Sequence, residues 1–319
     1  MRIAVTGGSG FAGSHFIDFL LKKNPNDEIY VLRRWHSTGH FQNLDHLKSG
    51  SVKFFEGDLT DAWSMLDFIR TVKPDQIAHI AAHTYVPYSY SSPLATMDTN
   101  CQGTINLLEA IRHEAPQCKI LIVSSGEVFG SHDGVITEES ALNPRSPYGL
   151  GKLAEDRAAY LYQQSYGLDL VIARSFSQVG PRKFVGLFDS SWAFQIARME
   201  RRGFEPVLHV GKLDTTRTFC DIHEMVEAYH LYLNQGTSGD MYIICGNSVL
   251  RMDAVIEMLR GMTSVKFDVV QDPARMRPTD VMKLAPVCDP FKKRFGWEPK
   301  VSYETSLLNL LSYWRERLK

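Results

Sequence analysis

The 319-residue sequence predicts an α/β protein with a doubly wound parallel sheet, followed by a smaller mixed α/β lobe. Short apolar runs alternate with helical patterns through the first 175 residues, which is the arrangement of βαβ units with helices on both faces of a sheet. The first unit turns on a glycine cluster that separates an apolar run at 3–5 from a helical pattern beginning at 15. Both observations favour a fold that binds a ligand at the carboxyl edge of its sheet.

Composition and charge exclude several classes of protein. The chain has 35 Lys and Arg against 36 Asp and Glu, a formal net charge of -1, so nothing favours a nucleic acid or an anionic membrane as partner. No apolar run approaches the roughly 20 residues of a membrane span. The first strand leaves no room for a targeting segment, and we expect a cytoplasmic protein. The five cysteines are isolated, which favours buried thiols over a disulfide framework or a metal site.

The remaining elements follow in order along the chain. Apolar runs predict further strands at 28–32, 52–58, 76–82, 119–123 and 168–173. A helix is expected to begin at 58–61 with Asp58 or Thr60 as its cap, and a longer helical pattern covers 95–114.

The pattern loosens beyond Pro181. Helical segments at 190–202, 222–234, 253–260 and 303–318 alternate there with short strands at 207–210 and 241–245. We therefore expect a nucleotide-binding domain at 1–175, with a later returning segment near 210–235, and a second lobe at 176–319.

The glycine cluster has the spacing Gly7-x-x-Gly10-x-x-Gly13. A strand, a tight turn and a helix in this order place backbone N–H groups at a helix N-terminus, where a pyrophosphate can bind. The glycines could also serve the turn alone. Arg33 and Arg34 follow the second strand, where a dinucleotide fold meets the adenosine ribose, and arginine there suits a 2′-phosphate. We expect NADP(H) as the preferred cofactor, with NAD(H) as the alternative.

Tyr148 and Lys152 share one face of a helix that Ser146 and Pro147 are expected to begin. A nearby ammonium favours the phenolate and lowers the pKa of a tyrosine, which would let Tyr148 act as a general acid or base. The preceding strand ends at Ser125, whose hydroxyl could bind the same substrate oxygen. A non-catalytic nucleotide-binding protein on this fold would be expected to lack one of these three groups.

With these motifs the chain resembles the extended short-chain dehydrogenase/reductases that act on nucleotide sugars. The matching motifs are the glycine turn at 6–13, Gly57-Asp58-Leu59, Ala81-Ala82-His83, Asn100, Ser124-Ser125, Tyr148-x-x-x-Lys152 and Gly180-Pro181. The resemblance implies a Rossmann-type fold with Ser125, Tyr148 and Lys152 as catalytic residues. The expected cofactor site comprises Gly7, Gly10, Phe11, Ala12, Gly13, Arg33, Arg34, Asp58, Leu59, Ala81, Ala82, His83, Asn100, Ser124, Tyr148 and Lys152.

The C-terminal half is most similar to the GDP-mannose branch of that family. The similar segments are 210–214, 217–219, 275–281, 289–290 and 296–297. This similarity implies that Arg217 and Arg277 bind the nucleotide diphosphate, a task that suits a planar guanidinium. The expected substrate site comprises Ser125, Gly126, Glu127, Ser177, Arg182, Val210, Lys212, Arg217 and Arg277, with no metal.

Two reactions of this branch share the framework. A reductase delivers one hydride to C4 of a GDP-4-keto-6-deoxy-hexose and gives GDP-rhamnose. A GDP-mannose 4,6-dehydratase needs a further base for the C5 proton, and Glu127 stands where that catalytic base is found. Gly126 favours the reductase, because dehydratases usually place an oxygen-bearing side chain beside the catalytic serine.

The resemblance therefore predicts an NADP(H)-dependent reductase of a GDP-sugar, with the dehydratase as its alternative. A nucleotide-sugar 4-epimerase, or a reductase of another 4-keto sugar such as a heptose, also stays open. Ser177, Gln178 and Thr218 depart from the Asn, His and Asp of the branch, so the sugar itself is not fixed. Relatives pair the two long helices in a four-helix bundle, which implies a homodimer, and many serve deoxysugar and lipopolysaccharide biosynthesis.

Overall fold

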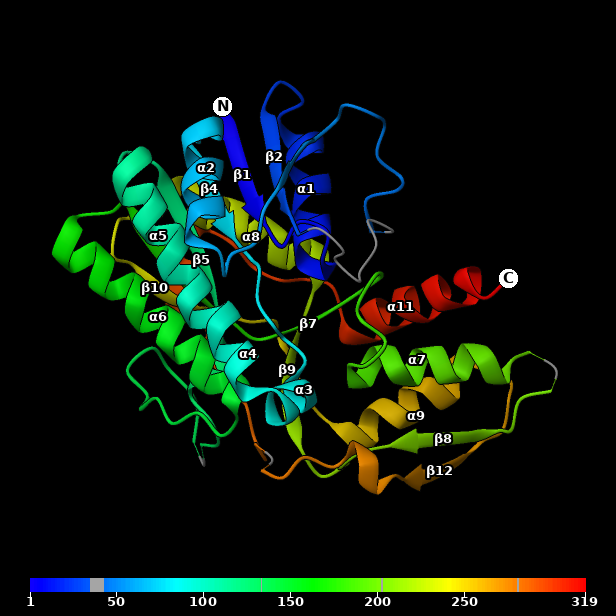
Figure 1. Cartoon of the computed structure of the whole chain (residues 1–319). Helices are drawn as coiled ribbons and strands as arrows, with labels where there is room; N and C mark the ends of the chain where they lie inside the picture. The colour runs from blue at the N-terminus through cyan, green and yellow to red at the C-terminus, as the bar shows by residue number, and fades with distance from the viewer. Residues whose placement is uncertain (35–42, 133, 202, 280) are drawn as a thin grey trace.

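A seven-stranded sheet forms the centre of the computed structural model, which describes residues 1–34, 43–132, 134–201, 203–279 and 281–319. All its strands are parallel, in the order β10-β6-β5-β4-β1-β2-β3 (Figure 1). The strands are β1 (Arg2–Thr6), β2 (Glu28–Arg33), β3 (Lys53–Glu56), β4 (Gln76–His79), β5 (Lys119–Ser125), β6 (Leu170–Ser175) and β10 (Met241–Ile244). The predicted doubly wound sheet is confirmed.

Helices cover both faces of this sheet. Helices α2 (Ala62–Val72), α5 (Gly103–Glu114) and α6 (Pro147–Tyr166) bury their apolar side chains in a core on one face. Helices α1 (Phe11–Lys23) and α8 (Ile222–Gln235) pack against each other over the opposite face, where a second core forms. Because the sheet is buried on both sides, its inner strands read as nearly continuous apolar runs in the sequence.

The helical pattern expected at 95–114 is interrupted in the structure. Helix α4 (Pro93–Met97) leads into a π-helical turn at Asp98–Gln102, and α5 follows directly. A π-turn inserts one extra residue into a helix and is frequent at functional sites. Here it buries Asn100 completely and aims it at the strand ends rather than at solvent. A short helix, α3 (Val86–Ser91), precedes this run.

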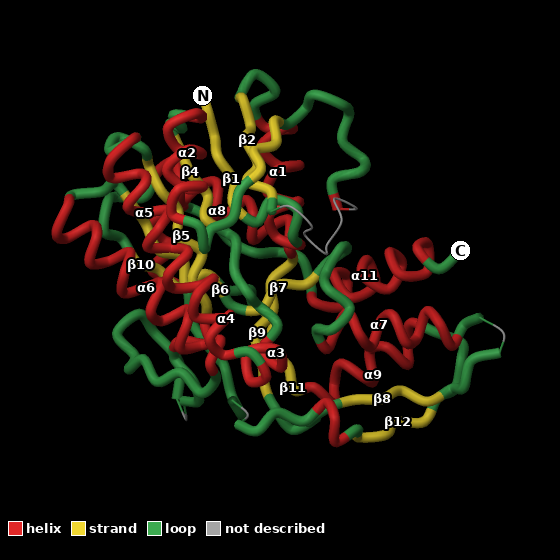
Figure 2. Tube along the Cα trace, in the orientation of Figure 1, coloured by secondary structure: helices red, strands yellow, loops and turns green. Residues whose placement is uncertain are grey.

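The second lobe has its own apolar core, separate from the two cores of the main sheet. A three-stranded sheet in the order β11-β9-β7 joins this lobe to the main sheet (Figure 2). The further strands are β7 (Ser177–Val179), β8 (Val207–Val210), β9 (Thr216–Asp221), β11 (Ser248–Arg251) and β12 (Asp268–Gln271). The helices of the lobe are α7 (Phe188–Met199), α9 (Met252–Met262) and α11 (Tyr303–Arg317).

The chain crosses back to the main sheet after β9. Helix α8 lies on the sheet, and β10 pairs in parallel with β6, so the returning segment spans 222–244 rather than the expected 210–235. The difference has a packing cause, because Val210 belongs to β8, which pairs with β12 and buries its apolar side chains in the second lobe. Helix α10 (Asp289–Phe295) also returns and packs on β10 and α8.

The start of α2 corrects another expectation. Its cap is Asp61, whose carboxylate accepts a hydrogen bond from the Trp63 N–H at 3.1 Å, and a cap of this kind contributes about 1 kcal/mol. Asp58 instead accepts from the Thr60 N–H at 3.0 Å, which closes the turn between β3 and α2. Asp58 therefore stays outside the helix, beside the cavity described below.

The five cysteines are free thiols, and all except Cys101 are buried, as their isolated positions predict. Within the described ranges, no helix combines the length and the apolar character needed to cross a membrane.

Candidate active site

The glycine turn forms one end of the site. Gly7 has a φ of +71°, a conformation that glycine adopts at no steric cost, and its carbonyl accepts the Gly10 N–H at 2.9 Å. Helix α1 then begins without any side-chain cap, so backbone N–H groups of its first turn remain available to a ligand. A Cβ on Gly13 would lie 2.2 Å from the Gly7 carbonyl oxygen. The turn therefore fits an anion held close to the backbone.

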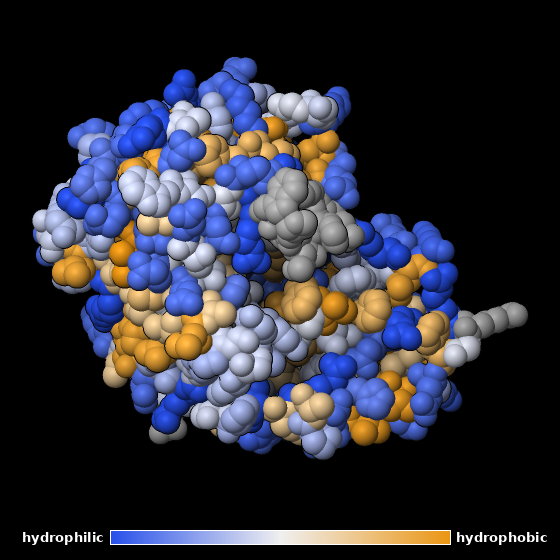
Figure 3. Space-filling view, in the orientation of Figure 1, coloured by the Kyte–Doolittle hydropathy of each residue, from blue (hydrophilic) through white to orange (hydrophobic). Residues whose placement is uncertain are grey.

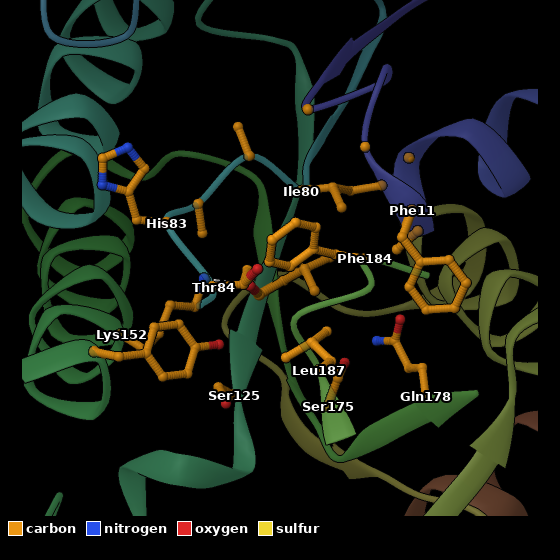
Figure 4. Close-up of a pocket in the computed structure, with 18 of the residues that line it drawn as sticks. Phe11, Ile80, His83, Thr84, Ser125, Lys152, Ser175, Gln178, Phe184 and Leu187 are labelled. Atoms are coloured by element: carbon orange, nitrogen blue, oxygen red, sulfur yellow. Dashed lines mark hydrogen bonds between the residues drawn. The ribbon is translucent and has the colours of Figure 1, made fainter. Parts of the chain in front are cut away.

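A cavity of about 570 Å³ extends from this turn across the carboxyl ends of the strands to the second lobe. Figure 4 shows Phe11 and Gln178 at one side of it, Ser125 and Lys152 at the other, and Phe184 projecting between them. The volume is that of a ligand-binding cleft.

Most of the predicted site residues line this one cavity. They are Gly7, Gly10, Phe11, Ala12, Gly13, Arg34, Asp58, Leu59, Ala81, Ala82, His83, Ser124, Ser125, Gly126, Glu127, Tyr148, Lys152, Ser177, Arg217 and Arg277. These residues come from both halves of the chain, so the structure brings the cofactor and substrate candidates together.

Arg33 does not line the cavity. It lies opposite Glu56 in the register of β2 and β3, forms an ion pair with that carboxylate, and stacks on the Phe54 ring at 4.8 Å. Because side chains alternate along a strand and its exit, Arg34 lies at the cavity instead. Of the two arginines expected at the cofactor, the structure therefore places only Arg34 at the cavity.

Asn100 is also outside the lining, but it acts on the cavity wall. Its Oδ1 accepts the His83 N–H at 2.7 Å, and its Nδ2 donates to the His83 carbonyl at 3.2 Å. This two-point contact fixes the backbone that follows β4, whose residues do line the cavity. The predicted importance of Asn100 thus has a structural basis without direct exposure to a ligand.

Three expected substrate residues lie away from the cavity. Arg182 turns back onto α1, where its guanidinium forms an ion pair with Asp18 at 2.7 Å. Val210 is completely buried in the core of the second lobe. Lys212 lies on the surface, 3.9 Å from the Asp214 carboxylate. The substrate role expected for all three is therefore not supported by their positions.

Ser125 and Tyr148 meet at the carboxyl end of β5. The Ser125 hydroxyl lies near enough to the Tyr148 phenol to oppose the rise of its pKa, and it accepts the Glu127 N–H at 3.2 Å. Ser146 caps α6 by accepting the Gly149 N–H at 3.0 Å, and Pro147 occupies the first turn, as the sequence predicts. The cap fixes where α6 begins and so aims Tyr148 at the strand end.

The pKa of Tyr148 departs from the sequence-based expectation. Burial raises it, because removal from water disfavours the phenolate, and the carboxylates of Glu127 and Glu155 raise it further. The Lys152 ammonium donates to the Val123 carbonyl at 2.7 Å and to Glu155 at 2.5 Å. The pKa of Tyr148 is thus raised where the sequence predicted a lowering by Lys152, and burial is the first cause.

The model of the GDP-mannose 4,6 dehydratase family matches residues 4–309 of the chain. The protein belongs to the GDP-mannose 4,6-dehydratase family.

Individual relatives agree with this membership. GDP-6-deoxy-D-mannose reductase of Pseudomonas aeruginosa is 32% identical over 322 residues, covering 100% of this chain and 98% of the relative. GDP-mannose 4,6 dehydratase 1 of Arabidopsis thaliana is 29% identical, covering 94% of this chain and 86% of the relative. The solved structure of RMD from Pseudomonas aeruginosa, complexed with NADPH, has a TM-score of 0.85 at 29% identity and covers 99% of both chains. The resemblance to extended short-chain dehydrogenase/reductases is confirmed.

Gly126 and Glu127, which bear on the reaction within the GDP-mannose 4,6-dehydratase family, are both constrained by neighbours. A Cβ on Gly126 would lie 2.6 Å from the Phe176 ring, so that ring fills the space that a larger side chain would need. Glu127 lines the cavity with Oε1 3.7 Å from the Arg277 guanidinium. The position beside Ser125 therefore has no room for an acid, while the next position holds one paired with a cation.

The cavity also contains residues that the sequence analysis did not select. The loop before α7 contributes Lys183, Phe184 and Leu187, and α7 contributes its first residue, Phe188. Lys183 is buried with Asp189 at 2.6 Å, and Phe184 contacts the Tyr85 ring at 5.4 Å between centroids. In the sequence, the only local signal for this part of the cavity wall was the pair of aromatic residues Phe184 and Phe188 shortly after Gly180-Pro181.

Proposed function

We propose that this protein is an NADPH-dependent reductase of a GDP-4-keto-6-deoxy-hexose that forms GDP-rhamnose or a close relative. The observation that carries the proposal is the Ser125–Tyr148 hydroxyl pair beside a glycine whose space Phe176 fills. This geometry supplies a proton donor for the O4 oxygen. At the position of Gly126 it lacks the oxygen-bearing side chain that dehydratases usually place beside the catalytic serine. The reductase of Pseudomonas aeruginosa, similar over the whole length of the chain, supports the same reaction.

NADPH fits the residues at the glycine turn. The open N-terminus of α1 offers backbone donors for its pyrophosphate, and the close approach of Gly13 to Gly7 leaves the backbone uncovered. Arg34, exposed at the cavity beyond β2, suits the 2′-phosphate, while Asp58 and Leu59 line the adenine side. When bound, the cofactor supplies the hydride for C4. NAD(H) would lack the contact with Arg34.

The proton comes from the chain itself. In this proposal Ser125 and Tyr148 bind the O4 carbonyl oxygen, and Tyr148 donates its phenolic proton as the C4 centre is reduced, which gives an alcohol and a phenolate. The Lys152 ammonium stabilises that phenolate until solvent returns the proton. Arg217 and Arg277, both at the cavity, bind the nucleotide diphosphate by paired hydrogen bonds.

A 4,6-dehydratase is the second candidate function, because Glu127 lines the cavity directly after the position of Gly126. A carboxylate there could accept the C5 proton. Glu127 is paired with Arg277, however, and this ion pair favours a role in which the Glu127 carboxylate stays charged and helps to hold the substrate. A 4-epimerase or a reductase of another 4-keto sugar would use the same Ser125–Tyr148 pair.

Two incubations of the purified protein distinguish these functions. With NADPH and GDP-4-keto-6-deoxy-mannose, we expect stoichiometric loss of NADPH absorbance and a GDP-deoxyhexose product identified by mass. With GDP-mannose alone, we expect no 4-keto product. A 4-keto product from GDP-mannose without added cofactor would establish the dehydratase instead, and a C4 epimer would establish the epimerase.

The two arginines after β2 provide a matched pair of variants. Arg34→Ala is expected to raise KM for NADPH about tenfold, the loss of roughly 1.4 kcal/mol of charge-assisted binding, and to leave KM for NADH unchanged. Arg33→Ala, which removes an ion pair with Glu56 away from the cavity, is expected to leave both constants unchanged. Steady-state kinetics with each cofactor check this, and equal effects of the two variants would contradict it.

A homodimer is proposed from the surface of α4 and α6. Leu94, Leu150 and Leu161 are large apolar side chains more than half exposed there, and Figure 3 has apolar atoms gathered over this region. Pairing of the α4–α5 run and α6 with the same helices of a second copy would bury these three side chains in a four-helix bundle. We also propose a cytoplasmic location and a role in deoxysugar synthesis for cell-surface polysaccharide.

A further inference from the structure

The part of the cavity wall that β7 forms carries a polar group with no part in the mechanism above. Gln178 stands where the GDP-mannose branch has a histidine, and Figure 4 shows its amide pointing from β7 into the cavity on the side of Phe11. Its Nε2 donates a hydrogen bond to the Tyr229 hydroxyl of α8 at 2.7 Å. No group of the described residues donates to its Oε1, so this oxygen is open to a ligand in the cavity.

A chain of buried hydroxyls fixes the orientation of the Gln178 amide. The fully buried Tyr229 hydroxyl donates to the Ser175 hydroxyl at 2.8 Å, and Ser175 has the Ala173 carbonyl as its own acceptor at 3.5 Å. A phenol has one proton, so a Tyr229 hydroxyl that donates to Ser175 can only accept from Gln178. The amide therefore turns its N–H group to Tyr229 and leaves its carbonyl oxygen for the cavity.

The backbone of Gln178 is held as well as its side chain. The Lys183 ammonium donates to the main-chain carbonyl of Gln178 at 2.5 Å and to the Asp189 carboxylate at 2.6 Å, and both charged side chains are buried. In addition, β7 pairs with β9 in a register that sets Gln178 opposite Cys220. An acceptor that is oriented before its ligand arrives avoids the entropic cost of ordering a side chain on binding.

The position of Gln178 indicates which group of a ligand its carbonyl can meet. Ser175, at the other end of the hydroxyl chain, is the partner of Ser125 in the register of β5 and β6. In the proposed function the pyrophosphate lies at the glycine turn and hydride is delivered beside Ser125, so the nicotinamide ring occupies the cavity between them. Phe11, which begins α1 after that turn, and Gln178 line the same side of this space (Figure 4). The one hydrogen-bond donor on a nicotinamide ring is the amino group of its carboxamide.

We propose that Gln178 binds the carboxamide amino group of the nicotinamide through Oε1, with Tyr229 and Ser175 as positioning residues that hold the amide in the accepting orientation. This inference rests on the proposed function, which places a nicotinamide cofactor in this cavity. The contact fixes the rotation of the ring about its glycosidic bond, and so selects the face of the ring that meets the substrate.

The test compares the binding of two oxidised cofactors in the absence of any sugar. NADP+ carries the amino group, and its 3-acetylpyridine analogue has a methyl group of similar size in its place. By isothermal titration calorimetry, we expect the parent protein to bind the analogue with a Kd about tenfold higher, because the Gln178 carbonyl would face a group that donates no hydrogen bond. Gln178→Met keeps the length of the side chain without the carbonyl, and its two Kd values are expected to agree within about twofold.

Three further measurements make the result specific to the oriented carbonyl. Tyr229→Phe removes the acceptor for Nε2 and frees the amide to turn over, so its ratio of Kd values should fall between those of the parent and Gln178→Met. Gln235→Met, at the exposed end of α8, is the matched control and should keep the parent ratio. The thionicotinamide analogue of NADP+ retains the amino group and should bind the parent protein as NADP+ does.

Equal binding of NADP+ and the acetylpyridine analogue by the parent protein would overturn the proposal, and this result needs no variant. A ratio that persists in Gln178→Met would overturn it too, and is the outcome expected if Gln178 contacts the sugar instead. A parent ratio in Tyr229→Phe would overturn the positioning role. If the parent enzyme shows the expected ratio but reduces no GDP-4-keto-sugar, the proposed function fails and the cofactor contact of Gln178 stands.

Discussion

Replacement of Tyr148 by Phe is expected to lower kcat for ketone reduction about 10³-fold, because it removes the phenolic proton placed beside Ser125. The ring itself is retained in the same buried position at the start of α6, so folding should be intact. The measurement is the initial rate of NADPH oxidation with a saturating 4-keto substrate. Binding of NADPH, followed by fluorescence titration, is expected to stay within about twofold of the parent enzyme, well below the 1.4 kcal/mol that a tenfold change requires.

Two controls make the outcome for Tyr148 specific. Tyr160→Phe removes an exposed hydroxyl from the same helix and is expected to leave kcat unchanged. Ser125→Ala removes the other hydroxyl of the pair and is expected to cost less than Tyr148→Phe, because it takes away a hydrogen bond and leaves the proton donor. Near-full activity of Tyr148→Phe would show that another group protonates O4.

Replacement of Gly13 by Ala is expected to abolish tight NADPH binding. The added Cβ would lie 2.2 Å from the Gly7 carbonyl oxygen and 2.7 Å from the Gly8 Cα, and both atoms belong to backbone that cannot yield without opening the turn. Strain of this kind costs about 3 kcal/mol, which corresponds to roughly a 100-fold loss of affinity if the turn opens to relieve it. Fluorescence titration with NADPH measures the loss.

Gly261→Ala is the matched control for that variant. Gly261 lies in α9, and nothing lies within 4 Å of a Cβ built there, so the substitution adds a methyl group in open space. Its affinity for NADPH should equal that of the parent protein, and its thermal midpoint should be the same or slightly higher. Parent-like binding by Gly13→Ala, in a folded protein, would contradict a pyrophosphate site at this turn.

The fold and the centre of the site could be predicted because their signals are local. Apolar runs of strand length, the glycine turn and the Ser146-Pro147 start of α6 each depend on a few adjacent residues. The two lobes then bring these segments together as a consequence of the sheet order. The resemblance of scattered motifs to one family selected many of the residues that line the cavity.

The errors arose where the outcome depends on contacts between distant segments. Arg33 and Arg34 are equivalent in the sequence, and only the register of β2 against β3 pairs the first with Glu56. Arg182 follows Gly180-Pro181 near the cavity, yet a φ of +69° turns its side chain onto α1, where Asp18 holds it. No pattern within either segment contains this information.

The ionisation of Tyr148 was misjudged for a related reason. The sequence shows the spacing between Tyr148 and Lys152, and it shows Glu155 three residues further on. A spacing does not tell whether that face of the helix is buried or exposed to solvent. The structure buries all three side chains, which reverses the direction of the pKa shift. Burial, more than sequence distance, decided the electrostatics of this helix.

The return of the chain through α8 and β10 determines when the nucleotide-binding half can fold during synthesis, and where the chain can be cut to build chimaeras. The edge strand beside β6 and one helix of the sheet come from 222–244, and α10 at Asp289–Phe295 seals them. A ribosome must therefore synthesise most of the polypeptide before the nucleotide-binding half can close. For the same reason the two halves cannot be exchanged between relatives by a single junction near residue 175, since such a chimaera would take its final strand from the other parent.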